Sequence, residues 1–266
     1  MSAALLRVAH MNLLQKTHKM ERYSLLAVDG VIGSVEELYF DEATWAVRYL
    51  VVNTGGWLKG RHVLISPVAV GEVDEEQGTI NVELTRDQIE NSPPVSANRP
   101  VSRQYEVEYY QYYDWTPYWA FGPLGGYPMS GASMATPPTP GEVETPGTPG
   151  KEDTHLHSTA EVNGYAIAAQ DGDIGHVDDF IVDIQYWVIR YLEIDTRNWW
   201  PGKHVLVNPD WIEDISWTEH TVSLDLNREA IKGAPGFDHT KEINRDFETR
   251  LFRYYGRPGY WRTGNQ

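Results

Sequence analysis

The sequence predicts a mainly β protein made of two small, strongly bent β-barrels, each followed by a short helix and an aromatic-rich amphipathic helix. Three observations support this fold class. A long segment occurs twice in the chain. Within each copy, short apolar runs of strand length alternate with turn residues, which is typical of a small barrel or sandwich. Aromatic residues at helical spacing follow each copy.

The repeat relates residues 29–67, DGVIGSVEELYFDEATWAVRYLVVNTGGWLKGRHVLISP, to residues 171–209, DGDIGHVDDFIVDIQYWVIRYLEIDTRNWWPGKHVLVNP, at a constant offset of 142 without a gap. The same offset extends the two copies to 17–119 and 159–261. A repeat of this length indicates two copies of one structural unit. The identical pairs include Asp29/Asp171, Gly33/Gly175, Trp45/Trp187, Arg48/Arg190 and His62/His204.

Composition limits the possible functions of the 266-residue chain. Without cysteine it can form neither disulfides nor thiolate sites. The formal net charge is −16, with 13 acids against 5 bases in residues 20–95 and 14 against 5 in residues 160–235. Direct nucleic-acid binding requires clustered lysines and arginines, so this charge disfavours it. A protein partner with a basic surface fits the charge better.

The chain shows neither a secretory signal nor a run of about 18 apolar residues, so we expect a cytoplasmic protein without a transmembrane segment. Peripheral membrane association and homo-oligomerisation stay open. Residues 1–16 form an N-terminal extension, for which a docked amphipathic helix and a frayed terminus are equal alternatives.

The first two strands are expected at Tyr23–Val28 and 32–40. Asp29-Gly30 lies between them, as Asp171-Gly172 does in the second copy, and such a pair between apolar runs is a strong hairpin signal. The apolar positions of the second strand break strict alternation, which indicates a bulge.

The remaining strands follow in order, separated by turns. In the first copy they are Trp45–Asn53, His62–Ile65, Val68–Val73 and Thr79–Leu84, and in the second Trp187–Asp195, His204–Val207, Asp210–Ile215 and Thr221–Leu226. Pro67 and Pro209 end the strands that begin at the two histidines.

Helices are expected after each barrel. Thr85 with Gln88 fits a capping box, and Asn227 holds the corresponding cap position. The aromatic helices lie within 101–119 and 243–261, and their terminal Tyr-Trp pairs should dock on a barrel. The expected domains are 1–16 extension, 17–95 first barrel, 96–119 first aromatic helix, 120–158 Gly/Pro/Thr-rich linker, 159–237 second barrel, and 238–266 second aromatic helix and tail. The linker composition is typical of an extended or disordered segment, long enough for pseudo-two-fold packing of the copies.

The doubled pattern of an Asp-Gly turn, an Ile-Gly step, a Trp-x-x-Arg-Tyr-Leu run and a final Val-Leu-x-x-Pro resembles the PRC-barrel family. That family is named after the photosynthetic reaction-centre H subunit and recurs in a ribosome-maturation factor. The trailing aromatic helices are similar to those of bacterial proteins with tandem PRC-barrels. The resemblance implies docking or assembly modules without catalysis, and it transfers no set of functional residues.

His62 and His204 are the histidines repeated at matched positions. Metal binding or a pH-sensitive pair is one interpretation. The simpler interpretation is a strand-entry residue satisfied by the backbone, because one histidine per copy supplies too few ligands and no second one stands nearby in sequence. His155 and His157 in the linker and the aspartates of 171–183 are weaker candidates, and no metal or other cofactor is expected.

A turn rich in tryptophan is the preferred interaction candidate. Trp57 occupies it in the first copy, and Trp199 with Trp200 in the second. Arg61 and Lys203 follow closely, and an exposed tryptophan beside a cation is typical of interfaces. Internal packing of these tryptophans is the alternative.

The sequence thus favours a non-enzymatic docking or assembly scaffold. An accessory factor in ribosome or RNA metabolism that binds a basic protein is one alternative. A small-molecule binder or enzyme that uses a cleft between the copies is the other.

Overall fold

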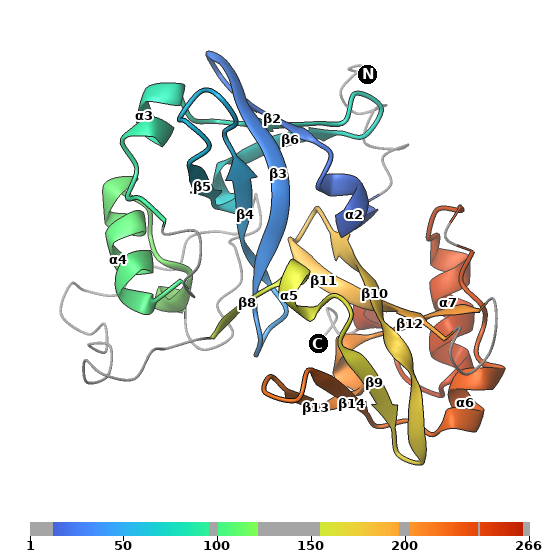
Figure 1. Cartoon of the computed structure of the whole chain (residues 1–266). Coiled ribbons are helices and arrows are strands. Elements are labelled where there is room, and N and C mark those ends of the chain that lie inside the picture. The colour runs from blue at the N-terminus through green and yellow to red at the C-terminus, as the bar shows by residue number, and fades with distance from the viewer. Residues whose placement is uncertain (1–12, 96–100, 122–154, 197–202, 239, 263–266) are drawn as a thin grey trace. The chain divides into compact units, whose positions relative to one another are not determined.

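The computed structural model describes residues 13–95, 101–121, 155–196, 203–238 and 240–262 (Figure 1). The chain divides into two compact units. The N-half unit comprises Lys19–Thr159 together with Gln185–Val188, and the C-half unit comprises Met1–His18, Ala160–Ile184 and Ile189–Gln266. Each unit is described by itself below.

The N-half unit contains one sheet, whose strands run in the order β5-β4-β3-β2-β7-β6, with β8 paired to β3. The β2–β7 pair is parallel and the other pairs are antiparallel. The strands are β2 (Ser24–Ala27), β3 (Gly30–Asp41), β4 (Val47–Asn53), β5 (His62–Ile65), β6 (Val70–Asp74), β7 (Thr79–Val82) and β8 (Leu156–Ser158).

The C-half unit contains a sheet of matching order, β12-β11-β10-β9-β14-β13, with β1 paired to β10. Its β14–β9 pair is again parallel. The strands are β1 (Leu14–Lys16), β9 (Ala166–Ala169), β10 (Gly172–Asp183), β11 (Val188–Asp195), β12 (His204–Val207), β13 (Ile212–Ser216) and β14 (Thr221–Leu224).

The structure confirms a mainly β chain with a few short helices, but hydrogen bonds do not close either sheet into a barrel. Among the described strands, no ladder joins β5 to β6 or β12 to β13, which stand at opposite ends of their sheets. The chain leaves β5 through the 3₁₀ helix η1 (Pro67–Ala69), and η3 (Pro209–Trp211) follows β12. Proline at the first position of each turn has no N–H to donate to a ladder, so the strand ends there.

Local sequence signals predicted most strand positions. The strands His62–Ile65 and His204–Val207 are confirmed, and the expected bulge is present in β3, where the pairing with β4 shifts between Val35 and Glu37. The strand expected from Trp45 begins instead at Val47, because Trp45 has a φ of 58° and belongs to the preceding turn.

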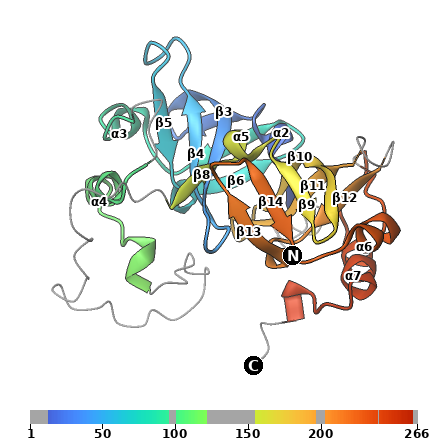
Figure 2. The same cartoon turned by 60° about the horizontal axis from the view of Figure 1, so that its bottom comes forward.

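The capping box of Thr85 and Gln88 is confirmed at the start of α3. Figure 1 shows α3 and α4 on the β5 side of the N-half sheet, and Figure 2 shows α6 and α7 beside the C-half sheet. The helices are α2 (Thr17–Met20), α3 (Arg86–Glu90), α4 (Arg103–Tyr112), α5 (Thr159–Val162), α6 (Arg228–Gly233) and α7 (Arg245–Tyr254), with the 3₁₀ turns η2 (Tyr118–Phe121) and η4 (Tyr260–Arg262).

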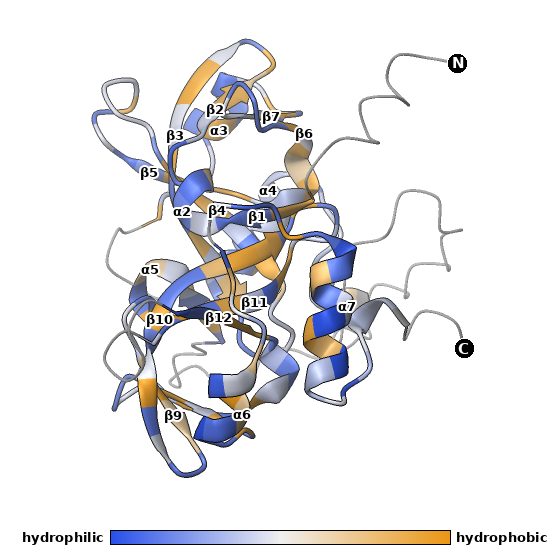
Figure 3. Ribbon diagram, turned by 90° about the vertical axis from the view of Figure 1, so that its right-hand side faces the viewer, coloured by the Kyte–Doolittle hydropathy of each residue, from blue (hydrophilic) through white to orange (hydrophobic). Residues whose placement is uncertain are grey.

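The aromatic helices α4 and α7 pack against the sheets of their own units. Apolar and polar residues alternate along α7 (Figure 3), and Leu251 and Phe252 are buried. In α4 the hydroxyl of Tyr109 donates to Leu64 O and accepts from Ser66 N. Tyr109 thus buries its aromatic ring while its hydroxyl keeps two hydrogen bonds. These contacts hold α4 against the end of β5.

Both segments that precede a repeat contribute a strand. Within the predicted extension 1–16, Leu14–Lys16 form β1 on β10, with Leu14 opposite Asp183. Within the predicted linker 120–158, residues 122–154 lie outside the described residues, while Leu156–Ser158 form β8 on β3. None of the described helices has the length and apolar character needed to cross a membrane.

Candidate functional site

Trp57, the first predicted interaction residue, is partly buried under a cation. It follows β4 in a turn, and the guanidinium carbon of Arg86 lies 4.4 Å from the centre of its ring. The backbone N of Arg86 donates to Asp29 Oδ1 at 2.8 Å, which places the Asp29-Gly30 turn beside the same arginine. Trp199 and Trp200 lie outside the described residues.

Arg61 and Lys203 have corresponding roles in their units. Arg61 donates to the carbonyls of Glu90 and Ser92 at the end of α3. The ammonium of Lys203 donates to the carbonyls of Lys232 and Ala234 at the end of α6. Burial lowers the pKa of Lys203. Both cations satisfy helix C-terminal carbonyls, which are orphan acceptors of a helix, so they act inside their own units.

The repeated histidines stand at the first residue of their strands, as predicted, and the side chain of each contacts a carboxylate. His62 Nε2 lies 2.6 Å from Glu36 Oε2 in the N-half unit. His204 Nδ1 lies 2.9 Å from Glu193 Oε1 and 3.6 Å from Asp178 Oδ2 in the C-half unit.

Glu193 is buried, and it lies between His204 and Lys16 in the C-half unit. Its side chain has no exposed surface, and its Oε2 accepts a 2.6 Å ion pair from Lys16 Nζ on β1. The ammonium also lies 5.1 Å from the centre of the Phe237 ring. Burial raises the pKa of Glu193, while Lys16 and His204 act in the opposite direction.

A second histidine lies beside this group. His176 Nε2 is 3.9 Å from Asp195 Oδ2. Together with Asp178, these two residues form one triad of potential metal ligands. Asp178 also forms a second triad with Glu193 and His204. Sequence reasoning missed this arrangement, because it considered one histidine per copy. We name His176, Asp178, Glu193, Asp195 and His204 the C-half cluster.

A sequence signal for the C-half cluster exists. At the offset of 142, His176, Glu193 and Asp195 stand opposite Ser34, Val51 and Asn53. Three potential ligands therefore occur in the second copy alone, whereas Asp178 and His204 have the counterparts Glu36 and His62. Potential metal ligands that lack a counterpart in the other copy are the sequence pattern that indicates this cluster.

Three other aspartates of 171–183 have separate structural roles. Asp171 Oδ1 accepts from Arg228 N at 2.7 Å, as Asp29 does from Arg86. Asp179 Oδ1 accepts from the hydroxyl of Thr17 at 2.6 Å, and Asp183 Oδ2 pairs with Arg190 at 3.2 Å. These three aspartates hold backbone and side chains in place.

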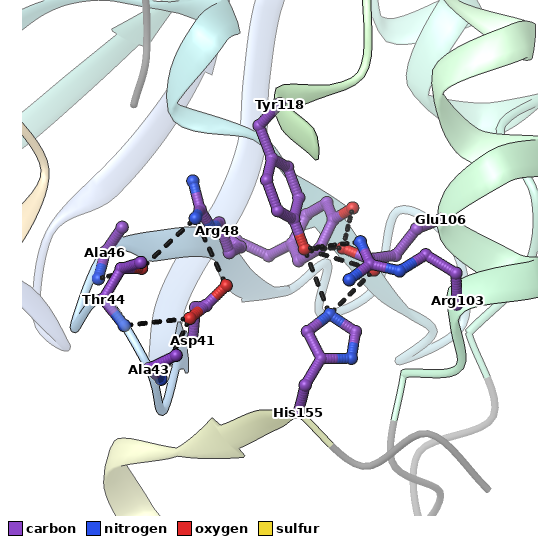
Figure 4. A network of polar contacts seen from close by, with 10 residues as sticks. Asp41, Ala43, Thr44, Ala46, Arg48, Arg103, Glu106, Tyr118 and His155 are labelled. Atoms are coloured by element: carbon purple, nitrogen blue, oxygen red, sulfur yellow. Dashed lines mark hydrogen bonds and ion pairs between the residues drawn. The ribbon is translucent and has the colours of Figure 1, made fainter. Parts of the chain in front are cut away.

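A buried glutamate joins each aromatic helix to its sheet. Glu106 on α4 has no exposed surface, and Figure 4 shows Arg103, Tyr118 and His155 directed at it. Tyr118 donates to Glu106 Oε1 at 3.0 Å, and Arg103 and His155 each lie 3.0 Å from Oε2. The Arg48 guanidinium carbon is 3.7 Å from the centre of the Tyr118 ring.

The C-half unit has the same arrangement around Glu248. Tyr191 donates to it at 2.8 Å, Tyr260 at 2.6 Å, and Arg245 Nη1 lies 3.0 Å from its Oε2. A buried carboxylate is costly unless donors surround it, and here several donors from the helix and the sheet do so. Because it recurs in both units around the docked helix, we interpret it as structural.

The linker histidines contact different carboxylates, His155 that of Glu106 and His157 that of Glu42 at 3.0 Å. They form no common group of ligands among the described residues.

Comparison with known proteins identifies the family of the N-half sheet. A segment of 73 residues is 33% identical to an uncharacterized protein of Deinococcus radiodurans, and the match covers 27% of this chain and 26% of that protein. The chain therefore matches about a quarter of that relative's length. Residues 22–89, from the residues just before β2 to α3, match the PRC-barrel domain. Residues 22–89 of the N-half sheet therefore carry a PRC-barrel domain.

Proposed function

We propose that the chain is a non-enzymatic docking or assembly scaffold, built from two PRC-barrels, that binds a protein partner. The observation that carries this proposal is an apolar turn at the surface of the PRC-barrel domain. Val28 and Val31 flank Asp29-Gly30 and are 68% and 58% exposed. Exposed apolar groups that lie together at a turn are typical of interaction sites.

The surroundings of this turn add the groups that interfaces favour. Arg86 contacts the turn through Asp29 and covers Trp57, so an arginine and a partly exposed aromatic ring lie beside the two valines. Tryptophan and arginine are enriched at the centres of protein interfaces. We name Val28, Val31, Trp57 and Arg86 the docking turn.

The partner expected from the charge is a protein with basic groups around an apolar contact. The net charge of −16 favours association with a positive surface. The same charge disfavours direct binding of RNA.

A second PRC-barrel in the C-half is part of the proposal. Its support is the constant sequence offset, the matching strand order and the recurrence of the buried glutamate beneath the aromatic helix. The docking role, however, is assigned to the first copy, because the second has the polar Gln170 and Asp173 at the positions of the two valines.

The test is capture of partners by the full chain and by a double variant, Val28→Ser with Val31→Ser. The matched control is Gln170→Ser with Asp173→Ser at the corresponding turn of the C-half. We expect a set of proteins that the wild type and the control retain and the valine variant loses, quantified by mass spectrometry. Because the valines are exposed, the melting temperature should change little.

Retention of the same partners by the valine variant would refute the docking turn. Turnover of a small molecule by the purified chain, with no partner enriched, would refute the scaffold role as a whole.

A further inference from the structure

The C-half cluster gathers five potential metal ligands on one face of three neighbouring strands. His176 and Asp178 alternate on β10, and Glu193 and Asp195 alternate on β11. Residues two apart on a strand point to the same face. His204 on β12 stands directly opposite Asp195 in the β11–β12 ladder, so it shares the face of the β11 pair.

The distances within the C-half cluster suit a bound ion. The three ligand atoms of each triad lie within 4.8 Å of one another. His204 Nδ1 is 2.9 Å from Glu193 Oε1 and 3.6 Å from Asp178 Oδ2, and His176 Nε2 is 3.9 Å from Asp195 Oδ2. Two ligands that each lie about 2.1 Å from one ion are at most about 4.2 Å apart. Small side-chain rotations are therefore enough to enclose an ion.

An independent observation concerns Glu193. Its side chain is fully buried, and Oε1 accepts no hydrogen bond from any residue that the structure describes, even though His204 Nδ1 lies 2.9 Å away. Burial of an ionised carboxylate is costly unless a charge or hydrogen bond compensates it. Lys16 compensates Oε2, so Oε1 is the atom directed at the other ligands.

We propose that the C-half cluster binds a divalent transition-metal ion. Imidazole nitrogen together with carboxylate oxygen is a ligand set that suits Zn²⁺, Mn²⁺ or Fe²⁺ better than Ca²⁺. Glu193 and His204 hold the ion from the protein side, and Asp178, with 37% of its side chain exposed, closes the site on the solvent side. Lys16 orients Glu193 through the oxygen that does not bind the ion, as outer partners of metal ligands do.

The N-half sheet provides a built-in control. At the counterpart positions, only the His62–Glu36 pair is kept, and Ser34, Val51 and Asn53 replace the other three residues. Ser34 pairs with Asn53, and Asn53 pairs with His62, in the ladders of that sheet. The N-half sheet therefore has the corresponding strand positions but lacks three of the five potential ligands, so the proposed metal site is specific to the C-half.

The experiment uses the full, untagged chain after removal of metals with a chelator. Zn²⁺ is titrated by calorimetry, and Co²⁺ by its visible absorption, which reports nitrogen and oxygen coordination. We expect saturable binding of at least one ion per chain. Asp178→Asn and His204→Gln should lower the affinity about ten-fold or more, because even outer partners of metal ligands have effects of that size.

The matched variants Glu36→Gln and His62→Gln in the N-half should bind as the wild type does. Zn²⁺ should also raise the melting temperature of the wild type but not that of His204→Gln, since a ligand of the folded state stabilises it. Circular dichroism of the metal-free variants checks that they are folded. Absence of saturable binding, or equal affinity in wild type, Asp178→Asn and His204→Gln, overturns the proposal.

Discussion

At Gly33 the strand β3 crosses the chain that leaves β4 so closely that a side chain has no room. A β-carbon placed at Gly33 would lie 2.0 Å from Asn53 O, and one placed at Gly175 would lie 2.0 Å from Asp195 O. Backbone atoms cannot yield as the end of a flexible side chain can. The Ile-Gly step of both copies is therefore a packing requirement, and in the C-half it lets β10 approach the backbone of Asp195, a member of the C-half cluster.

Substitution of this residue tests the packing argument. Gly33→Ala should lower the free energy of unfolding by about 3 kcal/mol, the upper range for an overpacked site. Gly56→Ala is the control, because nothing lies within 4 Å of a β-carbon there and φ is not positive. Urea denaturation followed by tryptophan fluorescence measures both. Equal midpoints for the two variants would contradict the close crossing.

At the scale of elements, the short strands β1 and β8 extend the two sheets. β1 pairs Gln15 with Val182 on β10, and β8 pairs His157 with Phe40 on β3. Ile184 N donates to Leu13 O. Because hydrogen-bonded pairs alternate in an antiparallel ladder, Gln15 is in a position that exchanges both hydrogen bonds. Gln15 and His157 are 142 residues apart, so they hold corresponding positions before the two copies. Substituting each in turn tests the two short strands separately.

Proline at either position removes a ladder donor. Gln15→Pro should speed amide exchange at 181–183 without affecting 39–41, and His157→Pro should do the reverse. The expected loss of stability is about 1–3 kcal/mol, that of a buried hydrogen-bond group left unpaired. Hydrogen–deuterium exchange with mass spectrometry measures the local effect. Unchanged exchange at 181–183 in Gln15→Pro would show that β1 contributes nothing to the sheet.

The whole molecule carries many buried tyrosines, and burial raises their pKa values. Tyr49 and Tyr109 are fully buried and their pKa values are raised well above the usual range, and burial raises the pKa of Tyr113 to about 12. The unfolded chain releases these protons near pH 10, whereas the folded chain retains them. The unfolded state then binds fewer protons, so stability must fall as the pH rises.

We expect full stability below about pH 10 and a progressive loss between about pH 10 and 12. Urea midpoints measured across this window test the loss. Ultraviolet titration of tyrosinate, with and without denaturant, gives the two sets of pKa values. Coincident titration curves for the folded and denatured chain would contradict the effect of burial.

Local sequence signals were enough to predict the individual elements. Asp-Gly pairs placed the hairpins, Thr85 and Gln88 placed the start of α3, and Pro67 ended β5. The sequence also indicated the PRC-barrel resemblance that the comparison of residues 22–89 confirmed. Such features depend on the backbone preferences of a few neighbouring residues, so they can be read without tertiary contacts.

Which distant residues meet could be seen only in the folded chain. Folding placed β1 on β10 and left the sheet edges unjoined. It also buried Glu193 beside His204, with His176 and Asp195 on the same face. The physical reason is that strand pairing and burial are long-range, and the cost of an ionised group depends on what surrounds it after folding. The C-half cluster was therefore visible in the sequence only as three unmatched residues of a repeat.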